Sequence, residues 1–270
     1  MTRVFCKDVS VSYRSGPVLK SVSFEAAKGQ LIGVIGPNGA GKSTLIRALA
    51  GLQSYSGDIQ WDEKDVRRMA ATERAKTIAY MPQARTVHWA LSCLDVVLLG
   101  RLPHHSRFTG PSDKDRETAL AAMSRMEVQG FAARPFDKLS GGEQARVLIA
   151  RMLAQDSACF LADEPVNGLD PAHQISLMQT FQEFAQAGRL VFVSLHDLTL
   201  AGRWCDRLLL IEHGALKVDT SPGELIGTGL IQEVYGIETI DIMLAGKPTI
   251  VPAAVRSNAS TLVPNQSDSF

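Results

Sequence analysis

The sequence is poor in cysteine, and the cysteines it has are scattered. Cys6, Cys93, Cys159 and Cys205 lie far apart in a chain of 270 residues, and no two of them form a Cys-X-X-Cys pair. This spacing argues against a disulfide framework and against a zinc site. We therefore expect buried, reduced thiols at these positions.

Long apolar runs are also absent. A transmembrane helix needs about 18 or more apolar residues in succession, and the longest candidates, 94–99 and 207–211, are far shorter. The first six residues lack the apolar run of a secretory signal. We expect a protein that is cytosolic or peripheral to a membrane.

The chain carries no net charge, because 28 lysines and arginines balance 28 aspartates and glutamates. This balance argues against a protein built chiefly to coat nucleic acid. The length allows one large domain or two small ones with a substantial core, and we find no internal repeat.

What the sequence does have is a phosphate-binding motif between a strand and a helix. Residues 36–44 read Gly-Pro-Asn-Gly-Ala-Gly-Lys-Ser-Thr, which fits the P-loop pattern. The apolar run 30–35 predicts a buried strand before it, and 45–50 predicts a helix that Gly51 ends. Glycines in this context let backbone N–H groups curl around phosphate oxygens, next to the partial positive charge of a helix N-terminus.

The motif gives its side chains candidate roles. Lys42 supplies a charge for the β- and γ-phosphates of a nucleotide, and Ser43 supplies a hydroxyl for Mg²⁺. The alternative is an ordinary glycine turn. The expected ATP-binding residues of the motif are Gly36, Pro37, Asn38, Gly39, Ala40, Gly41, Lys42, Ser43 and Thr44.

Strand and helix patterns alternate along the chain and predict an α/β fold with parallel βαβ units. Strands are expected at 77–81, 159–162, 190–194 and 207–211, with helices at 72–76 and 172–187. Strands at 4–13, 18–25 and 56–61 predict an antiparallel sheet next to the nucleotide core.

The middle of the chain has a different composition. Residues 84–155 are expected to be mostly helical, with 94–99 either helix or strand, a loop over 101–111, and a helix over 113–126 capped by Ser112. We expect one domain over 1–255, with the nucleotide core and antiparallel sheet in 1–83 and 156–225. Its C-terminal extension, 226–255, should hold a short helix after Pro222 and a hairpin around 246–248, before a disordered tail over 256–270.

Two carboxylates follow the predicted strand 159–162. Because neighbouring side chains of a strand point in opposite directions, Asp163 and Glu164 can have different roles. Asp163 is expected to order Mg²⁺ through water, and Glu164 to polarise an attacking water. The alternative is a pair of solvated loop acids.

A second glycine-led helix start lies at 139–143, Leu-Ser-Gly-Gly-Glu. It is either an anion-binding helix N-terminus or a capping box, with Ser140 as the N-cap and Glu143 three residues later. The residues alone leave both interpretations open, since the P-loop already holds the phosphates of one ATP.

The order of these motifs resembles the nucleotide-binding subunit of an ABC transporter over about residues 3–225. That order is the P-loop, Gln83 after a strand, 139–143, Asp163 with Glu164, and His196 after a strand. The resemblance implies an ABC ATPase cassette, which is a P-loop NTPase with a RecA-like core, an N-terminal antiparallel β subdomain and a helical subdomain. It also implies hydrolysis of ATP with Mg²⁺.

The resemblance further implies a head-to-tail dimer of two copies. In this dimer the signature of one copy faces the γ-phosphate held by the other. The signature residues are Leu139, Ser140, Gly141, Gly142 and Glu143.

Single residues carry over from the same resemblance. Tyr13 would stack on adenine, Gln83 would contact Mg²⁺ or water, His196 would hold the γ-phosphate, and Asp170 of the D-loop would cross the dimer interface. The implied catalytic residues are Glu164, His196, Lys42 and Gln83, and the implied Mg²⁺ site is Ser43, Gln83 and Asp163. Residues 144–146 read Gln-Ala-Arg where Arg-Gln-Arg is frequent in the family.

Residues 100–105, with Phe108, Gly110 and 112–115, resemble the ATPases of type II importers for ferric siderophores, haem and cobalamin. This implies a separate transmembrane permease docked on the 84–110 surface and, indirectly, a periplasmic substrate-binding protein. It places the chain at the cytoplasmic face of the bacterial inner membrane. From the residues themselves, His104 and His105 are interpreted as a solvated loop, with a metal site as the disfavoured alternative.

Three alternatives stay open within the family. The chain could serve another ABC transporter, including an exporter, because the ATP site does not record direction. A soluble ABC ATPase acting on nucleic acid usually carries a long coiled coil, and no sustained heptads lie between residues 44 and 139. Family members that act on translation normally have two cassettes, and this sequence has one. We expect no nucleic-acid partner.

Overall fold

The structure is a computed structural model that describes residues 3–83, 91–105 and 110–256. The disordered tail expected over 256–270 lies outside the described residues, apart from Arg256. Parts of the expected 84–110 docking surface, 84–90 and 106–109, also lie outside them.

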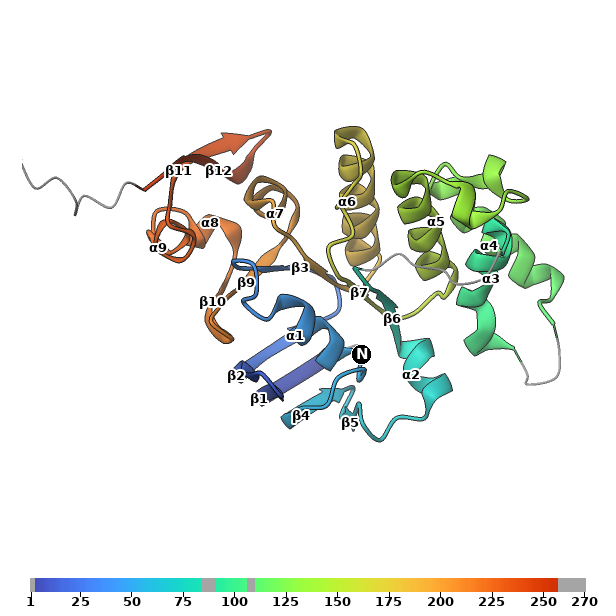
Figure 1. Ribbon diagram of the computed structural model, residues 1–270, viewed down its shortest axis with the longest axis horizontal. Coiled ribbons are helices and arrows are strands. Elements are labelled where there is room, and N and C mark those ends of the chain that lie inside the picture. The colour runs from blue at the N-terminus through green and yellow to red at the C-terminus, as the bar shows by residue number, and fades with distance from the viewer. Residues whose placement is uncertain (1–2, 84–90, 106–109, 257–270) are drawn as a thin grey trace, which may run out of the picture.

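A six-stranded sheet crosses the centre of the molecule in the order β10-β9-β3-β8-β7-β6 (Figure 1). Its strands are β3 (Gln30–Ile35), β6 (Ile78–Met81), β7 (Cys159–Ala162), β8 (Leu190–Ser194), β9 (Arg207–Glu212) and β10 (Ala215–Thr220). All of them run parallel except β10 at one edge. The carboxyl ends of the parallel strands therefore meet at one edge, where the P-loop follows β3.

Neighbouring side chains of the central sheet enter two different cores. In β8, Val191 belongs to the core cluster under the helices, and Phe192 belongs to the cluster facing the second sheet. This alternation follows from the two-residue period of a strand, and it buries both faces. The parallel strands consequently read as apolar runs, which is why the sequence predicts them.

An antiparallel sheet, in the order β2-β1-β4-β5, lies below the central sheet in Figure 1. Its strands are β1 (Arg3–Tyr13), β2 (Gly16–Ala27), β4 (Ser56–Trp61) and β5 (Lys64–Asp65). Helix α1 (Lys42–Leu49) packs with both sheets in one apolar cluster. The indole N–H of Trp61 in β4 donates to the carbonyl of Leu49, 3.0 Å away, and fixes the end of α1.

Most helices of the middle of the chain gather at the right end of Figure 1. They are α2 (Ala71–Thr77), α3 (Cys93–Leu98), η1 (Leu99–His104), α4 (Asp113–Arg125), η2 (Gln129–Phe131), η3 (Phe136–Lys138) and α5 (Gly141–Ala154), where η marks a 3-10 helix. Ser112 caps α4 as expected, with Asp115 completing a capping box. The predicted α/β fold with an antiparallel sheet and a helical region is confirmed, whereas the exact division of the chain stays a prediction.

Two expectations for this helical region are wrong. The loop expected over 101–111 begins as the 3-10 helix η1, because its residues pack on the end of α5. His105 is not solvated, since its side chain is 8% exposed and its Nε2 lies 3.0 Å from a carboxylate oxygen of Asp115. His104 is exposed, as expected. The ambiguous segment 94–99 is helical.

The C-terminal part returns to the core. Helices α6 (Pro171–Gln186) and α7 (Leu198–Trp204) pack on the central sheet. They are followed in the chain by α8 (Pro222–Leu225), α9 (Leu230–Tyr235) and the hairpin of β11 (Ile237–Leu244) and β12 (Lys247–Val255). The hairpin lies against α7, where the hydroxyl of Thr199 donates to the carbonyl of Ile250 over 3.1 Å.

The cysteine prediction is confirmed, since all four thiols are buried and free. Burial raises the pKa of the Cys6 thiol to about 12, so this thiol is not a reactive thiolate. Within the described ranges, no helix combines the length and the apolar character needed to cross a membrane.

Replacing Phe160 in the central strand β7 tests this packing. Phe160 is fully buried, and Phe160→Ala removes apolar contacts and leaves a cavity, so we expect a loss of about 3–5 kcal/mol of unfolding free energy. Leu52→Ala is the control, because Leu52 is 55% exposed. Urea denaturation of both variants measures the difference, and equal midpoints for the two would contradict the described core.

Candidate active site

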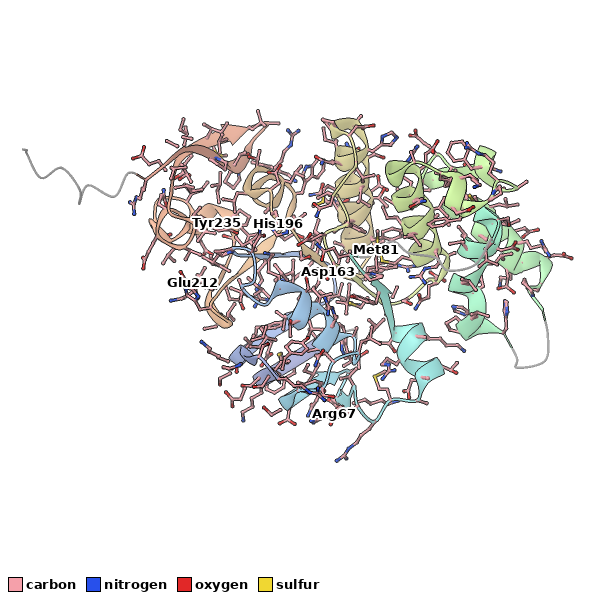
Figure 2. All side chains as sticks on the ribbon, in the orientation of Figure 1. Arg67, Met81, Asp163, His196, Glu212 and Tyr235 are labelled. Atoms are coloured by element: carbon pink, nitrogen blue, oxygen red, sulfur yellow. The ribbon has the colours of Figure 1, made fainter. Side chains whose placement is uncertain are left out.

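A cavity of about 660 Å³ opens at the carboxyl edge of the central sheet. It is lined by Tyr13, Val18, Asn38, Gly39, Ala40, Gly41, Lys42, Ser43, Thr44, Arg47, Gln83, Glu164 and His196. Figure 2 shows Asp163 and His196 near the middle of the molecule, next to the ends of their strands. Residues from five separate segments of the sequence therefore share one pocket.

The backbone of the P-loop requires glycine at two positions. Gly36 and Gly41 have φ angles of 147° and 109°, which disfavour any residue with a side chain. A Cβ on Gly36 would lie 2.0 Å from the carbonyl oxygen of Ile211, and a Cβ on Gly41 would lie 2.7 Å from Leu19. The loop can therefore keep this curl only with glycine at both positions.

Lys42 reaches back over the loop. Its ammonium donates to the carbonyls of Gly36 and Pro37, at 2.7 and 3.0 Å. Burial lowers the pKa of Lys42, and the carboxylates of Glu164 and Asp163 act against this shift. The charge is thus held at the mouth of the loop, where the phosphates of a nucleotide would lie.

Ser43 and Asp163 form a pair of hard oxygen donors. The Oδ1 atom of Asp163 accepts hydrogen bonds from Ser43 at 2.9 Å and from Ser194 at 2.7 Å. Its Oδ2 atom is buried and has no partner among the described residues. Hydroxyl and carboxylate oxygens are the ligands that Mg²⁺ takes in phosphate sites, so this pair fits the ion.

The described side chains do not by themselves provide a complete set of metal ligands. The described part of the chain contains no group of three or more His, Cys, Asp or Glu residues that could hold a metal ion. A cation next to Ser43 and Asp163 would therefore complete its shell with phosphate oxygens and water, as Mg²⁺ usually does.

Glu164 is buried, and both of its carboxylate oxygens are contacted. One oxygen accepts from Gln83 and from Asn167, both at 2.6 Å, and the other contacts Nε2 of His196. The interpretation of Asp163 and Glu164 as solvated loop acids is therefore wrong: their exposed fractions are 0% and 7%.

The two acids have different partners, for a reason that differs from the expected one. Strand β7 ends at Ala162, so strand alternation does not separate them. Instead, Glu164 has a positive φ of 51°, and its backbone N–H donates to the hydroxyl of Ser194 over 2.8 Å. Such left-handed positions cost free energy in residues other than glycine and cluster at functional sites.

Tyr13 lies at the rim of the cavity. Its side chain is partly exposed, and its hydroxyl donates to Gln53 over 2.8 Å. The ring is therefore tethered at its polar end and open to the cavity, and its stacking on adenine stays a prediction.

The signature segment does not line this cavity. Ser140 caps α5, and the Glu143 carboxylate accepts a hydrogen bond from the Ser140 N–H, so the capping box is confirmed. The same contact lowers the pKa of Glu143. A Cβ on Gly141 would meet nothing within 4 Å, so a side chain at this position would have open space.

Asp170 is also outside the cavity. It is the N-cap of α6, and its carboxylate accepts from the backbone N–H of His173 at 2.9 Å. Its side chain is 58% exposed, so it is available on the surface, and its role across a dimer interface stays a prediction.

Sequence reasoning missed three residues of the site. Ser194 joins Asp163 to the Glu164 backbone, and Asn167 holds the Glu164 carboxylate. Tyr235, in the C-terminal extension, has a buried hydroxyl without a hydrogen bond of standard geometry. Burial raises the pKa of Tyr235, and the backbone N–H of Gly36 acts against this rise. Only Asn167 had a signal, since residues 167–170, Asn-Gly-Leu-Asp, resemble the D-loop of the family.

Comparison with known proteins agrees with this geometry. The ABC transporter family model matches residues 19–167. A hemin import ATP-binding protein of Pseudomonas entomophila is 40% identical over 232 residues, which covers 84% of this chain and 89% of the relative. A manganese transport system ATP-binding protein of Halalkalibacterium halodurans is 35% identical over 235 residues, or 86% of this chain and 88% of the relative.

Solved structures show the same fold. A dimeric ATP-binding cassette in a post-hydrolysis state, bound to ADP and Pi, has a TM-score of 0.75 at 27% identity and covers 81% of this chain and 98% of its own. An inward-facing metal-chelate type ABC transporter has a TM-score of 0.80 and covers 94% of this chain and 98% of its own; its 24% identity makes this a likeness of fold alone. The chain belongs to the ABC transporter family and is an ATP-binding subunit with ATPase activity.

Proposed function

We propose that this chain energises a bacterial importer of metal chelates, such as haem, a ferric siderophore or cobalamin, by hydrolysing ATP. The observation that carries the proposal is the buried carboxylate of Glu164, held by Gln83 and His196 beside the P-loop. The importer class is supported by the hemin import relatives, at 40% and 38% identity. The second of these, from Rhodococcus jostii, aligns over 90% of this chain.

Within the site, each residue has a distinct task. Lys42 and the P-loop backbone bind the β- and γ-phosphates, and Ser43, Asp163 and Gln83 would hold Mg²⁺. When bound, Mg²⁺ neutralises charge on the phosphates. Glu164 accepts a proton from the attacking water.

His196 and Gln83 also hold the carboxylate of Glu164, the proposed base, until nucleotide binds. In the described arrangement they occupy the carboxylate oxygens of Glu164. A γ-phosphate offers His196 another anionic acceptor, and the amide oxygen of Gln83 would become a ligand of Mg²⁺. Nucleotide binding would then free the Glu164 carboxylate to contact water.

The signature completes the site from a second copy of the chain. Ser140 and Gly141 stand at the N-terminus of α5 and do not line the cavity of their own chain. A helix N-terminus binds anions. In the proposed dimer, the N-terminus of α5 binds the γ-phosphate that the P-loop of the partner copy holds. ATP thus binds the closed head-to-tail dimer more tightly than the open one and shifts the population toward it.

A groove of about 380 Å³ offers the docking surface for a transmembrane permease. It is lined by Ala50, Leu52, Ala71, Arg74, Ala75, Ile78, Tyr80, Pro82, Arg151 and Gln155. Pro82 directly precedes Gln83, so a permease segment in this groove would lie one residue from the active site. The neighbouring η1 exposes 59% of Leu102, an apolar side chain suited to a helix of a partner.

We propose that the docked chain lies at the cytoplasmic face of the inner membrane, and that a periplasmic binding protein delivers the chelate from the other side. An importer of a free metal ion is the alternative, and the manganese transport relative favours it. Transport assays with the chain and its co-purified permease, using haem, ferric siderophore, cobalamin and Mn²⁺, separate these substrates. Uptake of Mn²⁺ alone would contradict the proposed class.

Replacing Glu164 tests the proposed base. Glu164→Gln keeps the shape of the side chain and one accepting oxygen but cannot accept a proton, so we expect kcat for ATP hydrolysis to fall by about 10²–10⁴-fold while ATP still binds. Glu183→Gln is the control, because Glu183 is an exposed acid on α6 paired with Arg125. Hydrolysis by Glu164→Gln at the native rate would refute the role.

Replacing Lys42 tests the phosphate site. Lys42→Ala removes a charge-assisted hydrogen bond to phosphate, so the Kd for ATP should rise about 10-fold or more. Lys64→Ala is the matched control, since Lys64 is exposed, pairs with Glu73 and does not line the cavity. Equilibrium binding of a fluorescent ATP analogue measures both, and equal affinities for the two variants would count against the P-loop assignment.

A further inference from the structure

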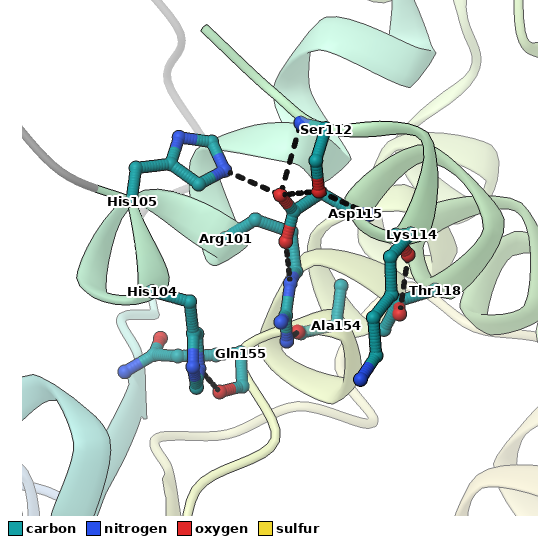
Figure 3. Close-up of polar contacts among 9 residues, drawn as sticks. All are labelled: Arg101, His104, His105, Ser112, Lys114, Asp115, Thr118, Ala154 and Gln155. Carbon is teal, nitrogen blue, oxygen red and sulfur yellow. Dashed lines mark hydrogen bonds and ion pairs between the residues drawn. The ribbon is translucent and has the colours of Figure 1, made fainter. Parts of the chain in front are cut away.

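A buried carboxylate ties the 3-10 helix η1 to the start of α4 (Figure 3). Asp115 accepts from Nε of Arg101 at 2.9 Å, and its second oxygen lies 3.0 Å from Nε2 of His105. The three side chains are each 8% or 9% exposed. Ser112 donates to the same carboxylate through its backbone N–H at 3.0 Å and through its hydroxyl at 2.5 Å.

Both oxygens of Asp115 are therefore fully used, and the group stays ionised. Hydrogen bonds from Ser112 and Arg101 hold the pKa of Asp115 well below its usual range. A buried ion pair is stable only when its remaining hydrogen-bonding positions are filled, and this one meets that condition. The network is thus a rigid joint between η1 and α4.

The same η1 closes the far end of α5. Nη1 of Arg101 donates to the carbonyl of Ala154 at 2.7 Å, and Nε2 of His104 donates to the carbonyl of Gln155 at 2.9 Å (Figure 3). The last carbonyls of a helix have no partner within it, and cations there also complement its dipole. A Cβ on Gly100 would lie 2.2 Å from the carbonyl of Arg151, so only glycine permits this close approach.

The end of α5 is bound to the nucleotide core as well. The side chain of Gln155 donates to the carbonyls of Ala75 and Ile78, at 2.6 and 3.0 Å. Arg151 donates to the carbonyl of Tyr80 in β6 over 3.3 Å. Strand β6 leads directly to Gln83, so one junction joins η1, α5 and the segment that enters the active site.

The opposite end of α5 carries the signature. The helix runs from Gly141 to Ala154 and spans about 21 Å at 1.5 Å per residue. A continuous helix of this length moves as one piece, so a group that fixes its last turn also fixes the direction of its first turn. Arg101 contacts neither the P-loop nor the cavity of its own chain.

We propose that Arg101, His104 and Asp115 form a clamp that positions the signature helix for contact with the ATP of a partner copy. The proposal rests on the proposed function, since it assumes a head-to-tail dimer. These are positioning residues, because they act through α5. The docking groove is lined by Arg151 and Gln155, which lie in the last turn and at the C-cap of α5, so a permease bound there would contact the helix whose end the clamp holds.

The clamp depends on the planar guanidinium group of Arg101, which has several N–H donors. It uses Nε for Asp115 and Nη1 for Ala154 at the same time. A lysine keeps the charge but presents a single nitrogen, and it cannot hold both partners in this geometry. Arg101→Lys therefore weakens the clamp while it leaves a cation for Asp115.

The test compares two readouts on the full-length chain carrying Glu164→Gln, which is expected to accumulate the ATP-bound dimer. The first readout is the Kd of fluorescent ATP at protein concentrations that keep the chain monomeric. The second is the ATP concentration that half-saturates dimer formation in sedimentation velocity. Arg101→Lys should raise the second value about tenfold and leave the first within twofold.

His104→Ala is a second variant that does not threaten folding, because His104 is exposed; it should raise the dimer midpoint by a smaller factor. Arg116→Lys is the matched control, an exposed arginine on the same turn of α4 as Asp115, and should change neither value. Unchanged dimer midpoints for both Arg101→Lys and His104→Ala overturn the clamp. Equal weakening of both readouts also overturns it, because that pattern indicates a merely structural role. No ATP-driven dimer in the parent Glu164→Gln chain overturns the proposed function itself.

Discussion

The carboxylate of Glu164 is the group on which the rest of the site depends. It is almost fully buried, and its three side-chain contacts come from Gln83 after β6, Asn167 in the following turn and His196 after β8. Its backbone is held in a left-handed conformation by Ser194. A buried carboxylate without such partners would be protonated or displaced, so these contacts keep a base beside the P-loop. They also connect it to two segments that can respond to nucleotide.

The sequence predicts the parts of this site whose residues follow a local rule. Strand 30–35 and Gly36 are predictable because an apolar run and a glycine-rich turn need no distant partner. Glu164 was named as the base, but the turn that aims it depends on Ser194, thirty positions later in the chain. Tyr235 reaches the P-loop only through the packing of the C-terminal extension, which no motif signals. The proposed roles of Gln83, His196 and Asp170 come from a family resemblance, since the geometry gives their places and not their tasks.

The helical region shows the same limit. The His, Pro and Gly residues of 101–111 suggest a loop, yet this segment begins as the helix η1, because Arg101 donates to a carbonyl 53 residues away in α5. The capping boxes at Ser112 and Ser140 were predictable, since both partners lie within four residues. The clamp gives the capping box at Ser112 a long-range function, because Asp115 both completes this box and binds Arg101 of η1. Local sequence thus determines where these helices start, and distant contacts determine how they are joined.

The central claim is that one ATP site is built from two copies of the chain, and mixing two defective chains tests it most directly. Both carry Glu164→Gln; one adds Lys42→Ala and keeps its signature, and the other adds Ser140→Arg and keeps its P-loop. Labelled as donor and acceptor, they should show ATP-dependent energy transfer only when mixed, because only the mixed pair contains an intact composite site. Energy transfer between copies of the same variant, or none on mixing, would contradict the account.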